Sequence, residues 1–437
     1  MKSILAIDIG SYKTIAIIAN AEDELSVSGV GIAKSKGIKK GAITNIDEAS
    51  KSIKQAVSDA KRIAGIDINK AIVSISSTYT QSIKSNGIVN IPGNEVTIKE
   101  INRAIQTALY NATIPNDYLV LQAIPYDFKV DELSEIDDPQ GMSGSRLEVS
   151  LHIIIAQKSG MENLKKTFKQ AGIEIANIVN AGYASALAVL NEDEKELGVA
   201  VIDIGATTSD LAVFVNKSLR YTDFLPVGSH HITNDLSMAL HTTLADAEKI
   251  KMNFEELIKN NEDLIEISII GNENEKQKAS LNTITQVISA RVEETFLLLN
   301  KEIETSGLKN KIGAGVVLTG GFTNFYNVKE IASQFFEGLP VRCGYPKEIN
   351  GLFENLNKPE FATVIGLLLY AIGENNKYEK DSNQQFKAEK VFTENDDISV
   401  NDADSSQDEE KEELLLPPKE EKVNPFKKFK NWLNNLF

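Results

Sequence analysis

The chain has 437 residues, of which 42 % are hydrophobic and 25 % are charged, as in an ordinary folded globular protein. These values exclude a collagen-like chain, a mucin-like stalk and a wholly disordered chain, and the length predicts two to four domains at roughly 100–200 residues each. Asp and Glu outnumber Lys and Arg by 62 to 46, so the net charge is −16 and general binding to nucleic-acid phosphates is not expected.

Two features of the sequence bear on the cellular compartment of the protein and on whether it spans a membrane. Cys343 is the only cysteine, so it cannot form an internal disulfide, and this favours a reducing compartment. The N-terminal residues lack the apolar core of a signal peptide, and the longest apolar stretch, residues 362–372, is too short to span a bilayer. We therefore expect no transmembrane helix.

Residues 1–373 alternate short apolar runs with helical patterns, and turn residues bound each run. This alternation predicts buried strands in an α/β sheet, joined by helices with one apolar face. The expected strands lie at residues 3–7, 71–75, 198–202 and 315–318, and the expected helices at residues 47–64 and 282–305.

The first strand ends in a turn that recurs 195 residues later, with Asp-Ile-Gly followed by hydroxyl-bearing residues in both copies. Such a turn can aim successive backbone N–H groups at one anion. Taken singly, each turn also fits an ordinary βα or hairpin turn, but two copies predict two similar halves with a phosphate between them. The candidate ligands are Asp8, Gly10, Ser11, Tyr12 and Lys13 in the first turn and Asp203, Gly205, Ala206, Thr207 and Thr208 in the second.

The two aspartates of these turns suggest a cation. Their carboxylates would face the same space and repel a phosphate unless a positive ion lay between them. Mg²⁺ usually retains several waters, so we expect Asp8 and Asp203 to hold it through its hydration shell.

Two further motifs are candidates for the nucleoside part of a ligand. The turn Gly320-Gly321-Phe322 follows a strand and could lie flat against a ribose or an adenine. Glu248 and Lys251 lie three residues apart on one helix face and could flank a purine or hold ribose hydroxyls. Without context, an ordinary strand-to-helix turn and an exposed ion pair are the alternatives.

In this order the motifs resemble those of the actin-like ATPase superfamily, and finer motifs resemble the FtsA family of bacterial cell-division proteins. Those finer motifs lie at residues 37–46, 124–131, 138–148, 191–198 and 227–235. The resemblance covers residues 1–373 almost continuously and resumes at the C-terminus. It implies ATP and Mg²⁺ as ligands, polymerisation into a homopolymer, membrane attachment, and binding to the C-terminal tail of the tubulin-like protein FtsZ.

The resemblance also implies an α/β fold of the actin-like (ribonuclease H-like) duplicated type, with two lobes and an FtsA-type inserted subdomain. FtsZ contacts are expected in the subdomain called IIB. The expected boundaries are residues 1–84 and 160–197 for subdomain IA, 85–159 for the inserted subdomain IC, 198–226 and 307–373 for IIA, and 227–306 for IIB.

Three residues depart from the family's motifs at the nucleotide. Where the family's second turn reads Asp-Ile-Gly-Gly-Gly-Thr-Thr-Asp, this chain has Ala206 and Thr207 in place of the last two glycines, and Phe322 replaces a glycine of the adenosine turn. These side chains would occupy space that backbone uses, so we expect weaker or altered nucleotide binding.

The helix expected before the second turn bears on hydrolysis. Actin-like ATPases place a polar residue there to orient water. Residues 181–190 offer only the hydroxyls of Tyr183 and Ser185. We therefore name no catalytic residue and expect at most a slow ATPase.

The C-terminal residues divide into two segments. Residues 374–422 carry a net charge of −9 and few apolar side chains, which predicts a disordered linker, with a solvated surface helix as the alternative. Residues 423–437 form an amphipathic helix if wound at about 100° per residue. Its apolar face would comprise Phe426, Phe429, Trp432, Leu433, Leu436 and Phe437, and its lysines are Lys427, Lys428 and Lys430.

An aromatic face beside lysines predicts binding to anionic lipid, and docking on the protein's own core or in a partner's groove is the alternative. Together with this pattern, the resemblance to the FtsA family implies an ATP-binding, polymerising protein that anchors the FtsZ ring to the cytoplasmic face of the inner membrane. It would be peripheral, lie at the division site and help to recruit other divisome proteins.

Two other classes of protein are alternatives. One is an actin-like adaptor of another envelope assembly, such as the pilus-assembly protein PilM, which lacks the acidic linker and terminal helix. The other is a sugar or acetate kinase, which needs a base for the acceptor hydroxyl, and no candidate base stands out.

Overall fold

The computed structural model describes residues 3–22, 24–76, 78–260, 263–351 and 356–388. The predicted terminal helix and all of the predicted linker beyond residue 388 lie outside these ranges. Within them, no helix combines the length and the apolar composition that crossing a membrane requires.

The first lobe is built on a six-stranded sheet in the order β11-β6-β1-β2-β3-β19. β1 runs antiparallel to β2 and parallel to β6, and the first predicted phosphate turn joins β1 to β2. The strands are β1 (Ser3–Ile9), β2 (Lys13–Asn20), β3 (Ser26–Lys34), β6 (Lys70–Ile75), β11 (Glu174–Asn180) and β19 (Asn350–Gly351).

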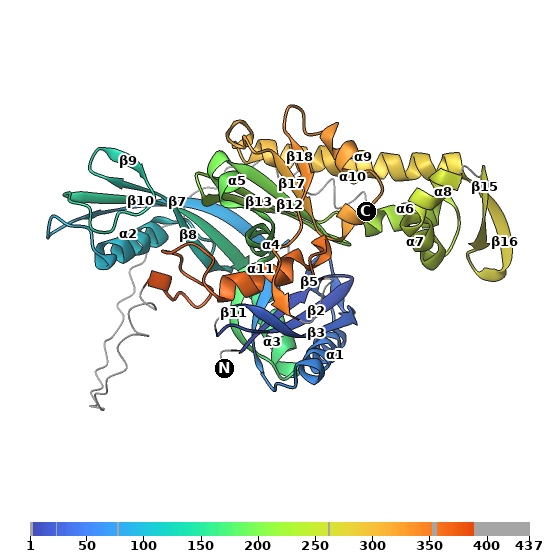
Figure 1. The fold of residues 1–437 in the computed structure, drawn as a ribbon, viewed down its shortest axis with the longest axis horizontal. Helices are drawn as coiled ribbons and strands as arrows, with labels where there is room; N and C mark the ends of the chain where they lie inside the picture. The colour runs from blue at the N-terminus through green and yellow to red at the C-terminus, as the bar shows by residue number, and fades with distance from the viewer. Residues whose placement is uncertain (1–2, 23, 77, 261–262, 352–355, 389–437) are drawn as a thin grey trace, which may run out of the picture. The chain divides into compact units, whose positions relative to one another are not determined.

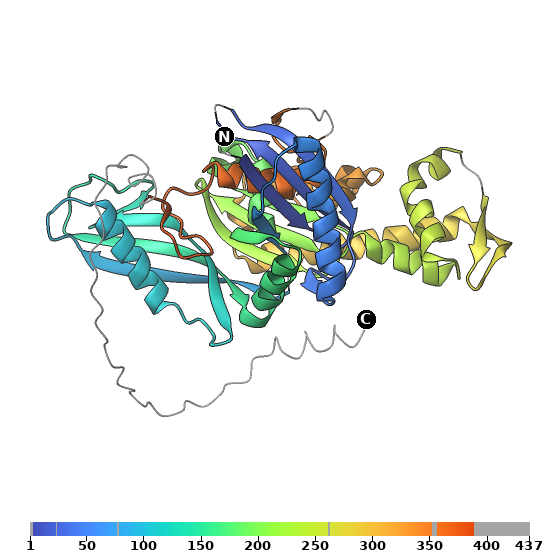
Figure 2. The same ribbon diagram turned by 90° about the horizontal axis from the view of Figure 1, so that it is seen from below.

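Helix α1 (Ile46–Ala64) covers β2 and β3, and its ends have local causes. The Asn45 side chain accepts a hydrogen bond from the Glu48 N–H, and Gly65 ends the helix at φ +67°. α1 can lie close to the sheet because Gly31 has no side chain. A Cβ at this position would stand only 1.9 Å from the Ala56 carbonyl oxygen. Figure 2 shows α1 beside α3 (Lys158–Gln170) on this face.

The second lobe repeats this arrangement with a five-stranded sheet in the order β14-β13-β12-β17-β18. β12 is antiparallel to β13 and parallel to β17, as β1 is to β2 and β6. The predicted duplication is thereby confirmed. The strands are β12 (Val199–Ile204), β13 (Ser209–Val215), β14 (Ser218–Leu225), β17 (Val316–Thr319) and β18 (Val341–Cys343).

Two helices, α4 (Ala181–Val189) and α11 (Ala362–Ala371), form a layer that joins the cores of both sheets. The two helices can cross closely because Gly366 has no Cβ. A Cβ at this position would stand 1.8 Å from the Ala184 carbonyl oxygen. α11 is the longest apolar stretch and contacts β1 and β6. This differs from the predicted assignment of residues 307–373 to subdomain IIA, since α11 and β19 pack with the first lobe.

The long helix α9 (Leu281–Thr305) packs in the core of the second lobe and extends into the smaller subdomain at its end (Figure 1). Its bounds agree with the predicted residues 282–305 to within one residue. That subdomain contains α6 (His230–Ala239), α7 (Leu244–Met252), α8 (Phe254–Asn260), β15 (Leu264–Ile269) and β16 (Asn272–Ser280).

The inserted subdomain has its own four-stranded sheet, in the order β7-β10-β8-β9, and its own hydrophobic core. One helix, α2 (Ile98–Asn111), packs on β7 and β10. The strands are β7 (Thr80–Asn90), β8 (Tyr118–Val130), β9 (Leu133–Ile136) and β10 (Arg146–Gln157), so the sheet begins at Thr80 rather than at the predicted residue 85.

The inserted subdomain also contacts the second lobe through β14. The buried imidazole of His152 lies 3.2 Å from the Ser82 hydroxyl and 3.3 Å from the Thr222 hydroxyl of β14. The Arg220 guanidinium lies 4.3 Å from the ring centre of Tyr126. Because of these contacts, we expect that weakening them would destabilise both the inserted subdomain and the second lobe.

Acidification should weaken this contact. Burial, with Lys84 nearby, lowers the pKa of His152 from 6.5 to about 3. Between those two pH values the unfolded chain binds a proton that the folded chain does not, so stability falls as the pH falls below 6.5. On moving from pH 7 to pH 5, the wild type should lose about 2 kcal/mol more unfolding free energy than His152→Gln, measured by urea denaturation. Equal losses would contradict this assignment.

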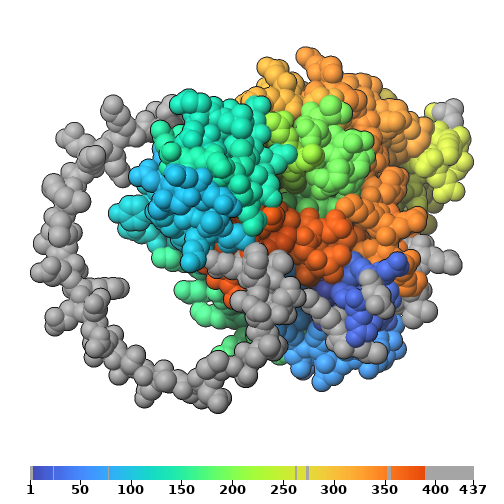
Figure 3. Space-filling view, turned by 60° about the vertical axis from the view of Figure 1, so that its left-hand side comes forward, coloured from blue at the N-terminus to red at the C-terminus, as the bar shows by residue number. Residues whose placement is uncertain are grey.

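Residues 374–388, named here the clasp, were predicted to begin the linker, and that prediction is wrong. Tyr378 and Phe386 join the core of the inserted subdomain, and the backbone of Lys380 exchanges hydrogen bonds of 2.9 and 3.0 Å with Ala123. Figure 3 shows the orange-red end of the described chain beside the inserted subdomain. The composition misled because the clasp buries polar side chains, whose partners come from distant elements.

Candidate functional site

A pocket of about 310 Å³ lies where the two repeated turns meet. Of the predicted nucleotide ligands, only Thr207 is not among the residues lining the pocket, and its buried hydroxyl has no hydrogen-bond partner. The lining residues that the sequence predicted are Asp8, Gly10, Ser11, Tyr12, Lys13, Asp203, Gly205, Ala206, Thr208, Glu248, Lys251, Gly320, Gly321 and Phe322.

The carboxylates of Asp8 and Asp203 lie at equivalent places in the two lobes, at the ends of β1 and β12. Asp8 accepts a 2.7 Å hydrogen bond from the Ser74 hydroxyl, and burial, with Asp203 nearby, raises its pKa to about 6. Asp203 accepts hydrogen bonds from Ser185 and Thr363, and burial raises its pKa as well.

A third carboxylate, Asp210, lines the same pocket and was missed in the sequence. It stands directly opposite Asp203 across the β12–β13 hairpin and accepts a 2.7 Å hydrogen bond from Ser76. Burial, and then Asp203 and Asp8, raise its pKa well above the ordinary value. The sequence did contain a signal for Asp210. Only residues 205–208 separate the two strands, and so short a turn places Asp210 opposite Asp203.

These carboxylates fit the predicted Mg²⁺. Like charges that face each other across a strand pair are destabilising, and a cation or a proton relieves the repulsion. Among the described residues, no three Asp, Glu, His or Cys side chains are arranged to ligate a metal directly. The arrangement therefore suits an ion held through water, with Asp8, Asp203 and Asp210 as the candidate holders.

The third turn fits a flat ligand. Gly320 has φ +86°, and a Cβ there would lie 2.2 Å from an Asp203 carboxylate oxygen, so only glycine suits this position. The next residue, Gly321, has open space where its Cβ would stand.

Phe322 was predicted to fill space that the nucleotide uses, but its side chain is only 4 % exposed. Its ring stacks on Phe325 at 5.3 Å and lies 6.4 Å from Phe296 of α9. Phe322 is therefore a wall of the pocket, anchored in the core of the second lobe.

Glu248 and Lys251 of α7 both line the pocket, and they form an ion pair with each other. Lys251 Nζ donates to Glu248 Oε2 at 2.8 Å and to the Thr233 hydroxyl at 3.0 Å, and Lys251 is buried. Beside it stands an aromatic wall that the sequence did not indicate, with Phe254 stacked on Phe325 at 5.8 Å and Tyr326 nearby. Nothing local marks these rings, because α8 and the turn after Gly321 meet only in the fold.

The two hydroxyls considered for hydrolysis do not line the pocket. Ser185 donates to Asp203, and the Tyr183 hydroxyl donates to Glu379 of the clasp at 3.1 Å. Asp210, which does line the pocket, is a carboxylate of the kind that can orient a water.

Two lobes of the same topology, each presenting an Asp-Ile-Gly turn to a shared pocket, define the actin-like class. Solved structures of this class are similar to the chain at 15 % identity. The PilM–PilN type IV pilus biogenesis complex has a TM-score of 0.60, covering 84 % of this chain and 98 % of that one. MreB5 of Spiroplasma citri bound to AMPPNP has a TM-score of 0.52, covering 90 % and 99 %.

The sequence comparisons are more specific. The model of the family "Cell division protein FtsA" matches residues 200–366, and that of the SHS2 domain inserted in FtsA matches residues 77–155. FtsA of Helicobacter pylori J99 is 39 % identical over 414 residues, covering 87 % of this chain and 84 % of that protein. FtsA of Bacillus subtilis 168 is 34 % identical over 373 residues, covering 84 % and 83 %. The chain belongs to the FtsA family of cell division proteins.

Proposed function

We propose that this cell division protein binds ATP with Mg²⁺ between its lobes, polymerises, and ties the FtsZ ring to the cytoplasmic face of the inner membrane. The observation that carries the nucleotide part is the convergence of both Asp-Ile-Gly turns and the Gly320–Gly321 turn on one pocket. A structural neighbour, MreB5, is described as bound to AMPPNP, which supports the same ligand class here.

Each group in the pocket has a distinct role in this proposal. The turn backbones and the hydroxyls of Ser11 and Thr208 hold the phosphates, and Lys13 adds a positive charge. Glu248 and Lys251 hold the ribose or flank the purine. Mg²⁺, when bound, neutralises charge on the phosphates and on the carboxylates.

Turnover is proposed to be slow. The two hydroxyls expected to orient a water, those of Tyr183 and Ser185, do not line the pocket and donate instead to Glu379 and Asp203. Nucleotide would then chiefly order the cleft and the contacts between subunits.

The membrane and partner roles rest on family membership and on the sequence of residues 423–437. Those residues would bind anionic lipid as a peripheral anchor at the division site, and many anchors in one polymer would bind far more strongly than one. The C-terminal tail of FtsZ would bind the subdomain at residues 227–306, and other divisome proteins would join this assembly.

Lipid-monolayer electron microscopy of the purified full chain tests these parts together. With Mg-ATP we expect filaments on anionic lipid that retain a labelled FtsZ tail peptide. Omitting nucleotide, using neutral lipid and scrambling the peptide are the controls. Filaments that form equally without nucleotide would contradict the ATP-dependent step, and an unretained peptide would contradict the proposed partner.

A further inference from the structure

The lining of the pocket is rich in acidic groups. It includes two lysines, Lys13 and Lys251, against six carboxylates: Asp8, Asp203, Asp210, Glu248, Glu255 and Glu360. Lys251 is already paired with Glu248 at the nucleoside end. Among the lining residues, Lys13 is therefore the lysine left to offset phosphate charge at the paired turns.

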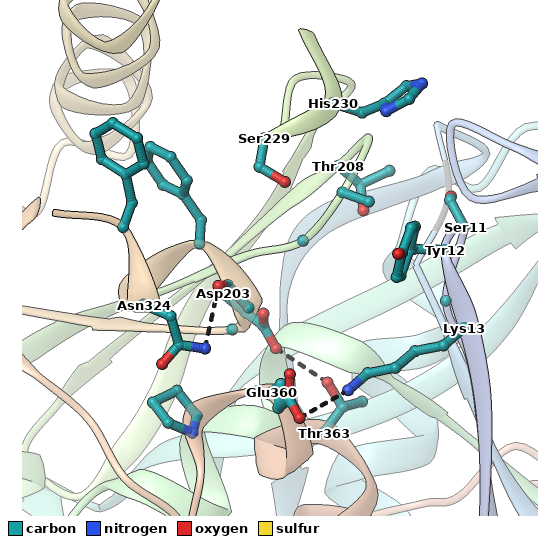
Figure 4. Close-up of a pocket in the computed structure, with 18 of the residues that line it drawn as sticks. Ser11, Tyr12, Lys13, Asp203, Thr208, Ser229, His230, Asn324, Glu360 and Thr363 are labelled. Carbon is teal, nitrogen blue, oxygen red and sulfur yellow. Dashed lines mark hydrogen bonds and ion pairs between the residues drawn. The ribbon is translucent and has the colours of Figure 1, made fainter. Parts of the chain in front are cut away.

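Lys13 is itself engaged with an acid. Its Nζ lies 3.1 Å from Glu360 Oε1 and 4.8 Å from the ring centre of Phe361, and Figure 4 shows Lys13 directed at Glu360. The two charged side chains are 23 % and 31 % exposed, so solvent screens the pair only partly. A phosphate that pairs with Lys13 would either displace this carboxylate or share the ammonium with it, and in both cases two anions compete for one positive charge.

The segment that carries Glu360 is held in place on both sides. The 3₁₀ turn η3 (Pro359–Phe361) ends in the buried Phe361, and Thr363 donates a 3.0 Å hydrogen bond to Asp203 of the second turn. The backbone is thus anchored, and Glu360 can leave Lys13 by rotating its side chain. Its carboxylate shares the pocket with Asp8 and Asp203, so it adds to the negative charge that a phosphate meets there.

We propose that Glu360 is an internal competitor of the nucleotide's phosphates for Lys13, and that it sets the affinity of this pocket. The inference rests on the proposed binding of ATP. It adds charge to the side-chain bulk of Ala206, Thr207 and Phe322 as a determinant of affinity, and of these three residues Phe322 packs in the core and Thr207 does not line the pocket.

The test is isothermal titration calorimetry of the full chain with ATP and, separately, with adenosine, both in saturating Mg²⁺. Glu360→Gln should bind ATP about tenfold more tightly than the wild type, equivalent to about 1.4 kcal/mol, and adenosine equally well. Glu196→Gln is the matched control, because it frees Lys217, 2.8 Å away, outside the pocket, and should leave both affinities unchanged.

A double-mutant cycle separates competition from simple repulsion. In a Lys13→Met background the gain from Glu360→Gln should fall below about threefold, since no ammonium is left to release. Circular dichroism of each variant without nucleotide verifies folding, and Lys13→Gln replaces Lys13→Met if the latter does not fold.

The outcomes are distinct. Unchanged ATP affinity in Glu360→Gln, an equal gain for adenosine, or an undiminished gain without Lys13 would each overturn the competition while leaving ATP binding intact. If neither the wild type nor Glu360→Gln binds ATP, the proposed function itself fails, and the inference fails with it.

Discussion

Glu379→Ala should lower the free energy of unfolding by about 3–5 kcal/mol, because it removes the centre of a buried polar cluster. Glu379 is 1 % exposed and lies in the clasp. Its carboxylate accepts four hydrogen bonds, three of them from side chains outside the clasp. The donors are Gln122 at 2.8 Å, Tyr183 at 3.1 Å, Tyr370 at 2.5 Å and Asn375 at 2.9 Å.

The size of the effect follows from what alanine leaves behind. The three buried donors, Gln122, Tyr183 and Tyr370, lose their acceptor inside the protein, where water does not replace it, and a cavity forms. Gln122 belongs to the inserted subdomain, Tyr183 to α4 and Tyr370 to α11, so the loss should loosen the clasp from the inserted subdomain and from the first lobe. Hydrogen exchange should rise in β8, which is hydrogen-bonded to Lys380.

Guanidinium denaturation measures the effect. Glu174→Ala is the control: it removes an exposed carboxylate, 3.2 Å from Lys70, and should cost less than about 1 kcal/mol. If Glu379→Ala unfolds within about 1 kcal/mol of the wild type, the clasp does not hold the first lobe and the inserted subdomain together.

Removing residues 423–437 should abolish sedimentation with anionic liposomes. Six apolar side chains would enter the headgroup boundary, and each of three lysines adds about 1 kcal/mol near an anionic surface. These residues lie outside the described part of the chain, so the expectation rests on their sequence pattern.

A pair of charge substitutions makes this prediction specific to one helix face. Trp432→Asp places a negative charge on the predicted apolar face and should act almost as strongly as the deletion. Asn431→Asp adds the same charge to the polar face and should weaken binding only modestly. If the truncated chain still sediments, the membrane contact lies elsewhere, and if both substitutions act equally, the segment does not bind as an amphipathic helix.

Several elements could be predicted from the sequence because their causes are local. Asn45 and Gly65 bound α1 to within one residue of the expected residues 47–64, and the apolar period of α9 marks its length. The repeated Asp-Ile-Gly turns predicted a duplicated fold, because a turn between two strands depends on a few neighbouring residues. Most of the predicted pocket residues do meet, since equivalent turns in the two lobes face one space.

Other features depend on contacts between residues that lie far apart in the chain, and only the tertiary structure decided them. Lys13 meets Glu360, and Tyr183 turns from the pocket to Glu379, across separations of well over a hundred residues. The sequence of the clasp is typical of a polar linker, because its charged and amide groups find partners only after the first lobe and the inserted subdomain have folded. Burial and pairing belong to the assembled fold, whereas caps, turns and periodicity belong to the chain itself.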